Sequence, residues 1–218
     1  MNTYKLTQML SRQVQRYRIA SVKLLVNELP REQYSHAMRI LKTNQNFQVF
    51  DDTAGTACVC QRRKRTPSST SVARCIATHE FCRAGTAKRK LLTKLDVKKF
   101  FPMLFRHGLP AGYYVDATGS NPLLGVVRVD VHTLPVNRIW QRSFKLLEHH
   151  RRQREFRKLI LGQHFQITWL VPSPSKVNAI HHLANRQQRD IPVVAQSVPS
   201  LLNQLAPLPN TFPDVVGL

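Results

Sequence analysis

Residues 112–115 read Gly-Tyr-Tyr-Val, residues 125–131 read Gly-Val-Val-Arg-Val-Asp-Val, and residues 165–171 read Phe-Gln-Ile-Thr-Trp-Leu-Val. Aromatic and β-branched residues dominate all three segments, which is typical of strands. Between the second and the third, residues 136–162 repeat apolar side chains at the three- and four-residue spacing of a helix. A helix over 173–185 and a short strand over 191–194 follow. This order predicts an α+β or α/β domain around a small mixed sheet.

Three short amphipathic helices are predicted before this core, over residues 3–17, 19–29 and 31–44, and Pro30 ends the second. Residues 47–50 and 56–60 flank a turn and predict a β-hairpin. Helices followed by a hairpin are the order of a winged helix-turn-helix, in which the last helix enters the major groove. The DNA-facing residues would then be Arg31, Gln33, Ser35, His36, Arg39 and Lys42.

The predicted domains are a winged helix over 1–65, a linker over 66–71, an α/β domain over 72–195 and a Pro-rich tail over 196–218. The α/β domain is expected to begin with a helix over 72–81, capped by Ser71. Just before the linker stands a basic run that would either contact phosphates or a minor groove, or be a solvated link. Its members are Arg62, Arg63, Lys64 and Arg65.

The charge balance indicates a polyanionic partner. The chain has 33 Lys and Arg against 12 Asp and Glu, a net charge of +21 and a pI of about 10.8. Phosphate backbones are the usual counterpart of such a surplus, so nucleic acid is the first hypothesis. The helix over 136–162 would be a second DNA surface through Arg138, Arg142, Arg151 and Arg152. No apolar run approaches the length of a membrane span, and we expect a cytoplasmic protein without a membrane partner.

Two short motifs sit on the predicted strands. They are Pro110-Ala111-Gly112-Tyr113-Tyr114 and Arg128-Val129-Asp130-Val131-His132-Thr133. With the order of elements around them, they resemble the replication-relaxation family of plasmids and mobile elements, which joins a winged helix to a domain derived from the PD-(D/E)xK nuclease fold. The resemblance implies double-stranded DNA as partner, a nucleoid or plasmid location in a bacterium, and a role in plasmid replication, mobilisation or regulation. A homodimer and replication or transfer proteins would be further partners.

The departures from the nuclease pattern concern catalysis. Ala111 and Arg128 stand where the resembling fold has the two acids that hold a divalent metal, and a guanidinium would repel that ion. We therefore expect a sequence-specific DNA-binding accessory factor without cofactor or catalysis. The alternative is a site-specific nickase or endonuclease that binds Mg²⁺ or Mn²⁺ in a displaced site. That site would use Asp116, Asp130, His132 and Lys145. A third reading is an RNA-binding or ribosome-associated protein.

Four cysteines offer a weak zinc candidate. Cys58 and Cys60 share one face of the hairpin strand, and Cys75 and Cys82 share one face of the next helix. Convergence of the four would give a tetrahedral site. Their spacing is not that of a standard zinc motif, so packing in the core is favoured over zinc, and zinc over a disulfide.

Overall fold

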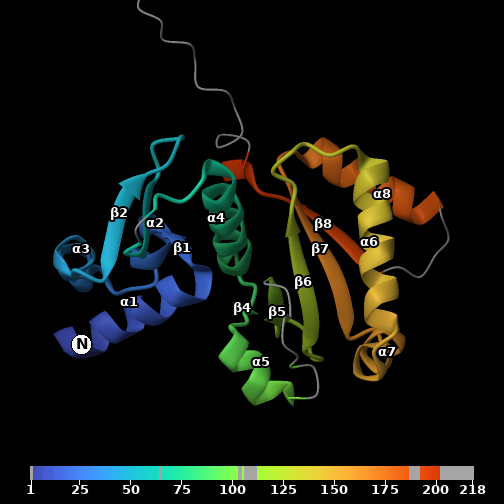
Figure 1. The fold of residues 1–218 in the computed structure, drawn as a ribbon, viewed down its shortest axis with the longest axis horizontal. Helices are drawn as coiled ribbons and strands as arrows, with labels where there is room; N and C mark the ends of the chain where they lie inside the picture. Colours follow the sequence, from blue (N-terminus) through green and yellow to red (C-terminus); the bar gives the residue numbers. More distant parts are fainter. Residues whose placement is uncertain (1, 64, 103–104, 106–111, 187–191, 202–218) are drawn as a thin grey trace, which may run out of the picture.

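The computed structural model describes residues 2–63, 65–102, 105, 112–186 and 192–201. The protein is a mixed α+β structure with a three-stranded sheet and a mixed five-stranded sheet, and helix α4 (Ser69–Arg83) stands between the two sheets (Figure 1). One side of α4 contacts β1 of the first sheet, and the other side contacts β4, β6 and β7 of the second.

The smaller sheet belongs to residues 3–61. Its elements are α1 (Thr3–Tyr17), β1 (Ile19–Ser21), α2 (Val22–Val26), the 3-10 helix η1 (Arg31–Gln33), α3 (Tyr34–Thr43), β2 (Phe47–Asp51) and β3 (Ala57–Gln61). The strands are antiparallel in the order β1-β3-β2. The hairpin is confirmed, but the predicted helix over 19–29 is wrong at its start, because Ile19–Ser21 pairs with β3. The Ser21 side chain then caps α2 by accepting a hydrogen bond from the Leu24 N–H.

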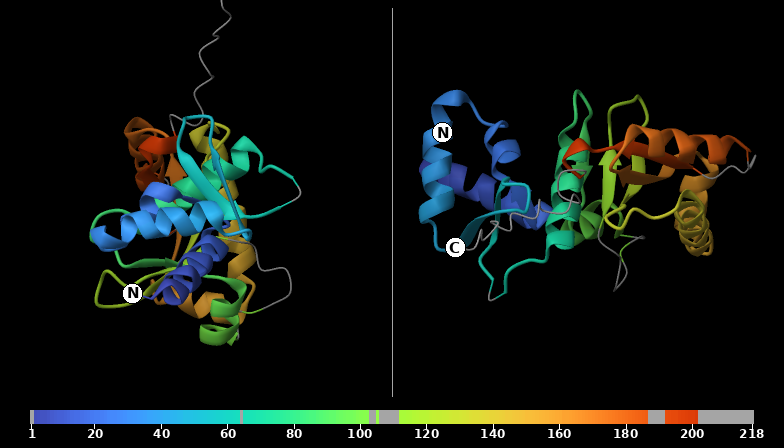
Figure 2. Two further views of the ribbon diagram at one scale, coloured as in Figure 1. Left: turned by 90° about the vertical axis from the view of Figure 1, so that its left-hand side faces the viewer. Right: turned by 90° about the horizontal axis from the view of Figure 1, so that it is seen from above.

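The larger sheet follows α4 in the chain. Its strands stand in the order β4 (Arg89–Leu91), β5 (Tyr113–Asp116), β6 (Leu123–Val129), β7 (Phe165–Val171) and β8 (Val193–Ser197). The first three strands are antiparallel, whereas β6, β7 and β8 are parallel, so the predicted mixed sheet is confirmed. Seen from above in Figure 2, α4 covers one face of this sheet, and the other face is covered by α6 (Val136–Arg151) and α8 (Pro174–Arg186).

Several predicted boundaries move. The helix over 136–162 is two helices, because α6 ends at Arg151, Gln153 is extended, and α7 (Arg154–Leu161) begins after it. Because the helix is interrupted between α6 and α7, the side chain of Phe156 on α7 can point into the core, where it is 1 % exposed. The α4 helix begins earlier than predicted and is capped by Ser68 rather than Ser71. Two elements that the sequence did not predict lie between α4 and β5. They are β4 and α5 (Lys94–Phe100).

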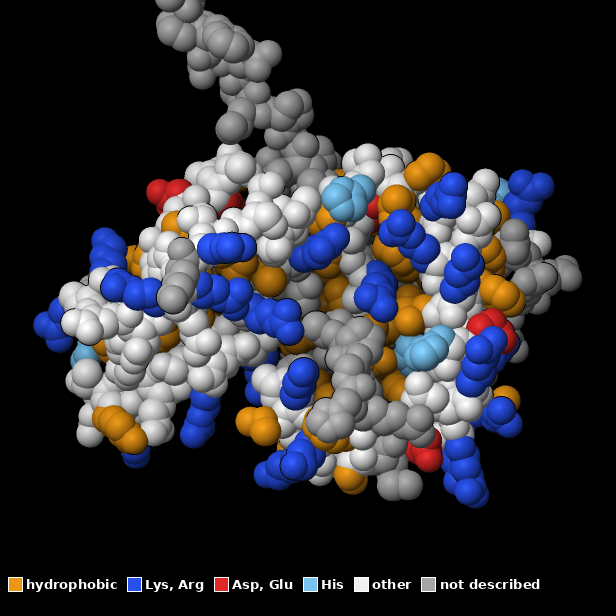
Figure 3. Space-filling model, in the orientation of Figure 1, with side chains coloured by type: hydrophobic (Ala, Val, Ile, Leu, Met, Phe, Trp, Pro, Cys, Tyr) orange, Lys and Arg blue, Asp and Glu red, His pale blue; other side chains and the backbone are white. Residues whose placement is uncertain are grey.

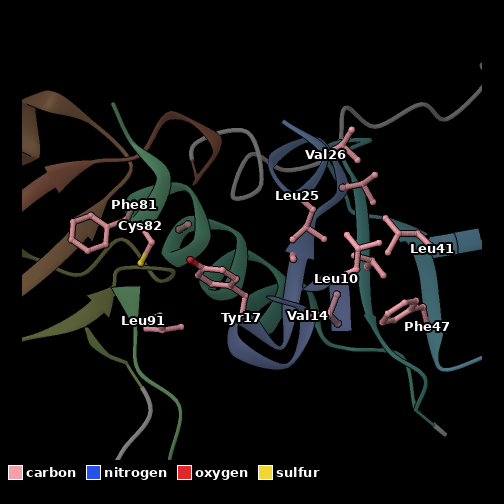
Figure 4. Close-up of a cluster of buried hydrophobic side chains, with 14 of the residues drawn as sticks. Leu10, Val14, Tyr17, Leu25, Val26, Leu41, Phe47, Phe81, Cys82 and Leu91 are labelled. Carbon is pink, nitrogen blue, oxygen red and sulfur yellow. The ribbon is translucent and has the colours of Figure 1, made fainter. Parts of the chain in front are cut away.

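The two predicted domains share one apolar core. In Figure 4 the buried side chains run from Leu10 and Leu25, through Tyr17, to Phe81 and Cys82 on α4. The same cluster continues to residues of the five-stranded sheet. Burial of this continuous apolar surface holds the two sheets in a fixed relation across α4. The surface where the two sheets meet beside α4 is therefore shaped by both halves of the chain.

Candidate nucleic-acid interface

A cleft of about 1040 Å³ opens between α4, the start of α5, the carboxyl end of β6 and the side of α6. In Figure 3 apolar side chains are visible in this hollow, and Lys and Arg side chains surround it. Its cationic lining residues come from separate segments of the chain and are Arg16, Arg18, Arg63, Arg74, Lys94, Arg128, Arg142 and Lys145. The described lining contains a single acid, Asp130, so the cleft concentrates positive potential.

Arg128 lies in the floor of the cleft. It belongs to β6, where it pairs with Trp169 of β7, and its side chain is half-buried. Burial lowers the pKa of its guanidinium, and the neighbouring Tyr113 opposes that effect only in part. Within the described residues no carboxylate forms an ion pair with it. A partly desolvated cation without a counter-charge is stabilised by an anion that enters the cleft.

Helix α6 forms one wall. Arg142, Lys145 and His149 recur at three- and four-residue spacing, are exposed, and line the cleft. The opposite face of the same helix, with Ile139 and Leu147, is buried against the sheet. Of the other cations predicted here, Arg138 and Arg152 are exposed away from the lining, and Arg151 pairs with Glu148. The expected DNA surface of this helix is thus divided between the cleft and the outer surface.

The facing wall comes from the N-terminal half. Arg18 follows α1 with a φ of 65°, Arg63 follows β3, and Arg74 stands exposed on α4. Lys94 adds a cation from the first turn of α5. Arg62 and Arg65 are exposed outside the lining, and Lys64 lies outside the described residues. Sequence reasoning missed Arg18, Arg74 and Lys94, because nothing in their local pattern marks them as neighbours.

Asp130 is a structural residue in this arrangement. Its side chain is 0 % exposed, and one carboxylate oxygen accepts from the Leu134 N–H at 2.8 Å. The other forms an ion pair with Lys176 of α8, whose side chain is 15 % exposed. Lys176 is separated from Asp130 by 46 positions in the chain, so the sequence carried no signal for this pair. Both oxygens have a protein partner, and the Lys176 ammonium neutralises the carboxylate charge that would attract a metal ion.

The displaced metal site predicted as the catalytic alternative does not assemble. Asp116 pairs in register with Leu123 at the first residue of β6, whereas Asp130 follows the last residue of that strand. The seven strand positions from Leu123 to Asp130 span about 23 Å, so Asp116 and Asp130 lie far apart. Two ligands of one metal ion must each lie within about 2.6 Å of it. Asp116 instead bonds Arg89 and Thr118; burial alone would raise its pKa, but these bonds lower it.

The other two residues of the predicted metal site lie in the cleft. His132 and Lys145 are both exposed and line the cleft. They can therefore face a bound anion there, while Asp116 cannot. Ala111, which stands where the resembling fold has its first acid, lies outside the described residues. Gly112 beside it has a φ of 110°, and its carbonyl accepts from the Val127 N–H at 2.7 Å.

A second basic surface lies on α3 and the turn before it. Ala37, Ile40 and Leu41 are buried, so α3 presents its other face to solvent. Arg31, Ser35, Arg39 and Lys42 are exposed and, at spacings of four, four and three, form a stripe along that face. Gln33 and His36 are half-buried, and Gln33 Oε1 and His36 Nε2 are buried atoms without a hydrogen-bond partner among the described residues.

The cysteines do not converge on one point. Cys58 and Cys60 are buried with Ile19, Val72 and Ile76, and Cys75 packs at the edge of that group. Cys82 belongs to the larger core around Tyr17. Burial raises the pKa of Cys58 to about 12 and that of Cys82 to about 11, so both are held as neutral thiols. Among the described residues no group of three or more His, Cys, Asp or Glu side chains could hold a metal ion.

A comparison with protein-family models, curated proteins and solved structures found no match to this chain. Among the described helices, none combines the length and the apolar character that crossing a bilayer requires.

Proposed function

We propose that the protein binds duplex DNA through its N-terminal module and carries a nuclease-like second module that does not cleave. The order α1-β1-α2-α3-β2-β3 with strands arranged β1-β3-β2 supports a winged helix. The order α4-β4-α5-β5-β6-α6-α7-β7, with β6 and β7 parallel, supports a relation to the PD-(D/E)xK core. In line with the resemblance to the replication-relaxation family, the biological role would be that of an accessory factor of a mobile element.

The basic stripe on α3 is the observation that carries this proposal. A helix enters the major groove with the face that its own domain leaves free, and Arg side chains there bind guanine O6 and N7 in a bidentate manner. Arg31 and Arg39 are exposed on that face, while the opposite side of α3 packs in the core. The β2–β3 hairpin and the exposed Arg62 after it would contact the flanking backbone.

The absence of catalysis is supported by the surroundings of Asp130. Its charge is neutralised by Lys176, and Arg128 occupies the floor of the cleft where a metal would need negative ligands. A cation at this position favours the phosphate group itself over a metal ion. The cleft is therefore suited to hold nucleic acid without activating water.

Selection from a random duplex library would first yield a bound site. Arg31→Ala or Arg39→Ala should then weaken binding to that site by about 1–3 kcal/mol for each lost base contact. Arg154→Ala with Lys158→Ala serves as control, because both residues are exposed on α7, outside the cleft and α3. Unchanged affinity and unchanged site preference in both α3 variants would refute recognition by this helix.

The nuclease alternative has its own test. Supercoiled plasmid carrying the selected site is incubated with the protein and Mg²⁺ or Mn²⁺. We expect no relaxation above the level of a metal-free control. Metal-dependent nicking that disappears in His132→Ala but persists in Arg154→Ala would overturn the non-catalytic proposal.

A further inference from the structure

The size of the central cleft limits what it can hold. At about 1040 Å³ it is at the upper end of the roughly 300–1,000 Å³ typical of small-molecule pockets. A segment of a few unpaired nucleotides matches this volume better than a DNA duplex, whose major groove alone is about 12 Å wide between two backbones. The exposed convex face of α3 has no such limit.

The walls of the cleft combine two chemistries. Cations stand on both rims, with Arg63 and Arg74 on one side and Arg142 and Lys145 on the other. Between them the lining includes apolar side chains that are only partly buried, Leu92, Leu134, Leu146 and Phe105. Phosphate alone needs no apolar surface, whereas the faces of unstacked bases do. Arg128 in the floor supplies an additional cation that forms no ion pair with a described carboxylate.

We propose that this cleft binds a single strand of nucleic acid, with phosphates on the two cationic rims and bases against the apolar lining. The inference rests on the proposed function only in that the protein binds nucleic acid, because the strand site and the α3 face are separate. Duplex on α3 and an unpaired strand in the cleft would together favour DNA that is locally open, such as a duplex with a single-stranded branch.

The test is a fluorescence anisotropy titration of the full chain at fixed salt. The probes are a labelled oligothymidylate of about 12 nucleotides, its oligouridylate counterpart, an abasic strand of the same length, and a duplex. The cleft variant is Arg142→Gln with Lys145→Gln. Arg154→Gln with Lys158→Gln is the matched control, because it removes the same charge from exposed positions outside the cleft. Arg31→Ala with Arg39→Ala reports on α3.

The cleft variant should weaken oligothymidylate binding about tenfold or more and duplex binding less than about threefold, and the α3 variant should do the reverse. The control should change both by less than about threefold. The abasic strand should bind at least about tenfold more weakly than oligothymidylate, since it keeps the phosphates and loses the bases. Equal binding of oligouridylate would support a site for an unpaired strand of either sugar.

Three results would overturn the inference. One is duplex binding without oligothymidylate binding, which leaves the proposed duplex function standing. Another is equal binding of the abasic strand, which reduces the cleft to a phosphate surface. The third is an equal loss in the cleft variant and the control. Oligothymidylate binding without duplex binding would instead refute the duplex proposal and keep this one. Because all substituted side chains are exposed, a matching thermal melting curve confirms that each variant is folded.

Discussion

Replacing Lys176 by Met removes the counter-charge of a fully buried carboxylate. Asp130 is 0 % exposed, and among the described residues the Leu134 N–H is the hydrogen-bond donor that the variant keeps. Breaking a buried pair from one side costs about 3–5 kcal/mol, because the remaining charge is uncompensated. Against a total stability of about 5–15 kcal/mol this is a large fraction. Lys176→Met should therefore sharply lower the urea midpoint.

The reverse change and the double change complete a cycle. Asp130→Asn should cost less, about 1–3 kcal/mol, because Lys176 is 15 % exposed and can turn its ammonium group to water. The double variant should cost less than the sum of the two, with a coupling of about 1–3 kcal/mol. Urea unfolding followed by circular dichroism at neutral pH measures all four proteins. A loss below about 1 kcal/mol in Lys176→Met would refute the structural role of the pair.

Three further outcomes are expected. Burial lowers the pKa of His79 and His150 in the folded protein, so at mildly acidic pH the unfolded chain binds more protons than the folded one. The free energy of unfolding should therefore fall as the pH drops below about 6.5, and urea denaturation at pH 7.5 and 5.5 measures this. Gly125→Ala should destabilise by about 1–3 kcal/mol or more in urea unfolding, because its Cβ would lie 2.2 Å from the buried Tyr114 ring. Duplex affinity should fall about 10³- to 10⁵-fold between 50 and 200 mM salt if six to ten phosphates are bound, as titration can show.

Strong periodicity predicted the elements that the structure confirms. The apolar spacing of α1 and the alternating, aromatic-rich segment of β7 were both visible in the sequence. Short elements could not be recognised in the sequence. Ile19–Ser21 looks like the start of a helix, because its strand character comes only from pairing with β3. Likewise, β4 contains Arg89 and Lys90 and has no strand-like pattern of its own, and it forms a strand because it pairs with the edge of β5.

The candidate sites divide in the same way. The basic face of α3 follows from local spacing. Of the six residues that the sequence predicted there, four are exposed, whereas Gln33 and His36 are half-buried. The cleft required segments far apart in the chain to meet. Of the predicted site residues that the structure describes, those that line it are Arg63, Cys75, Asp130, His132, Arg142 and Lys145. Asp130 itself has a partner from another helix, which turns a candidate metal ligand into a buried ion pair.

Composition and periodicity by themselves determined the charge of +21 and the helix faces, because these are sums over the chain or repeats within one element. The tertiary structure alone decided which charges are neutralised and which remain free. Lys176 reaches Asp130, Arg89 reaches Asp116, and Arg128 is left in the cleft without a described carboxylate. The energy of a charge depends on its burial and on its nearest counter-charge, and both are set by the packing of segments that are distant in sequence.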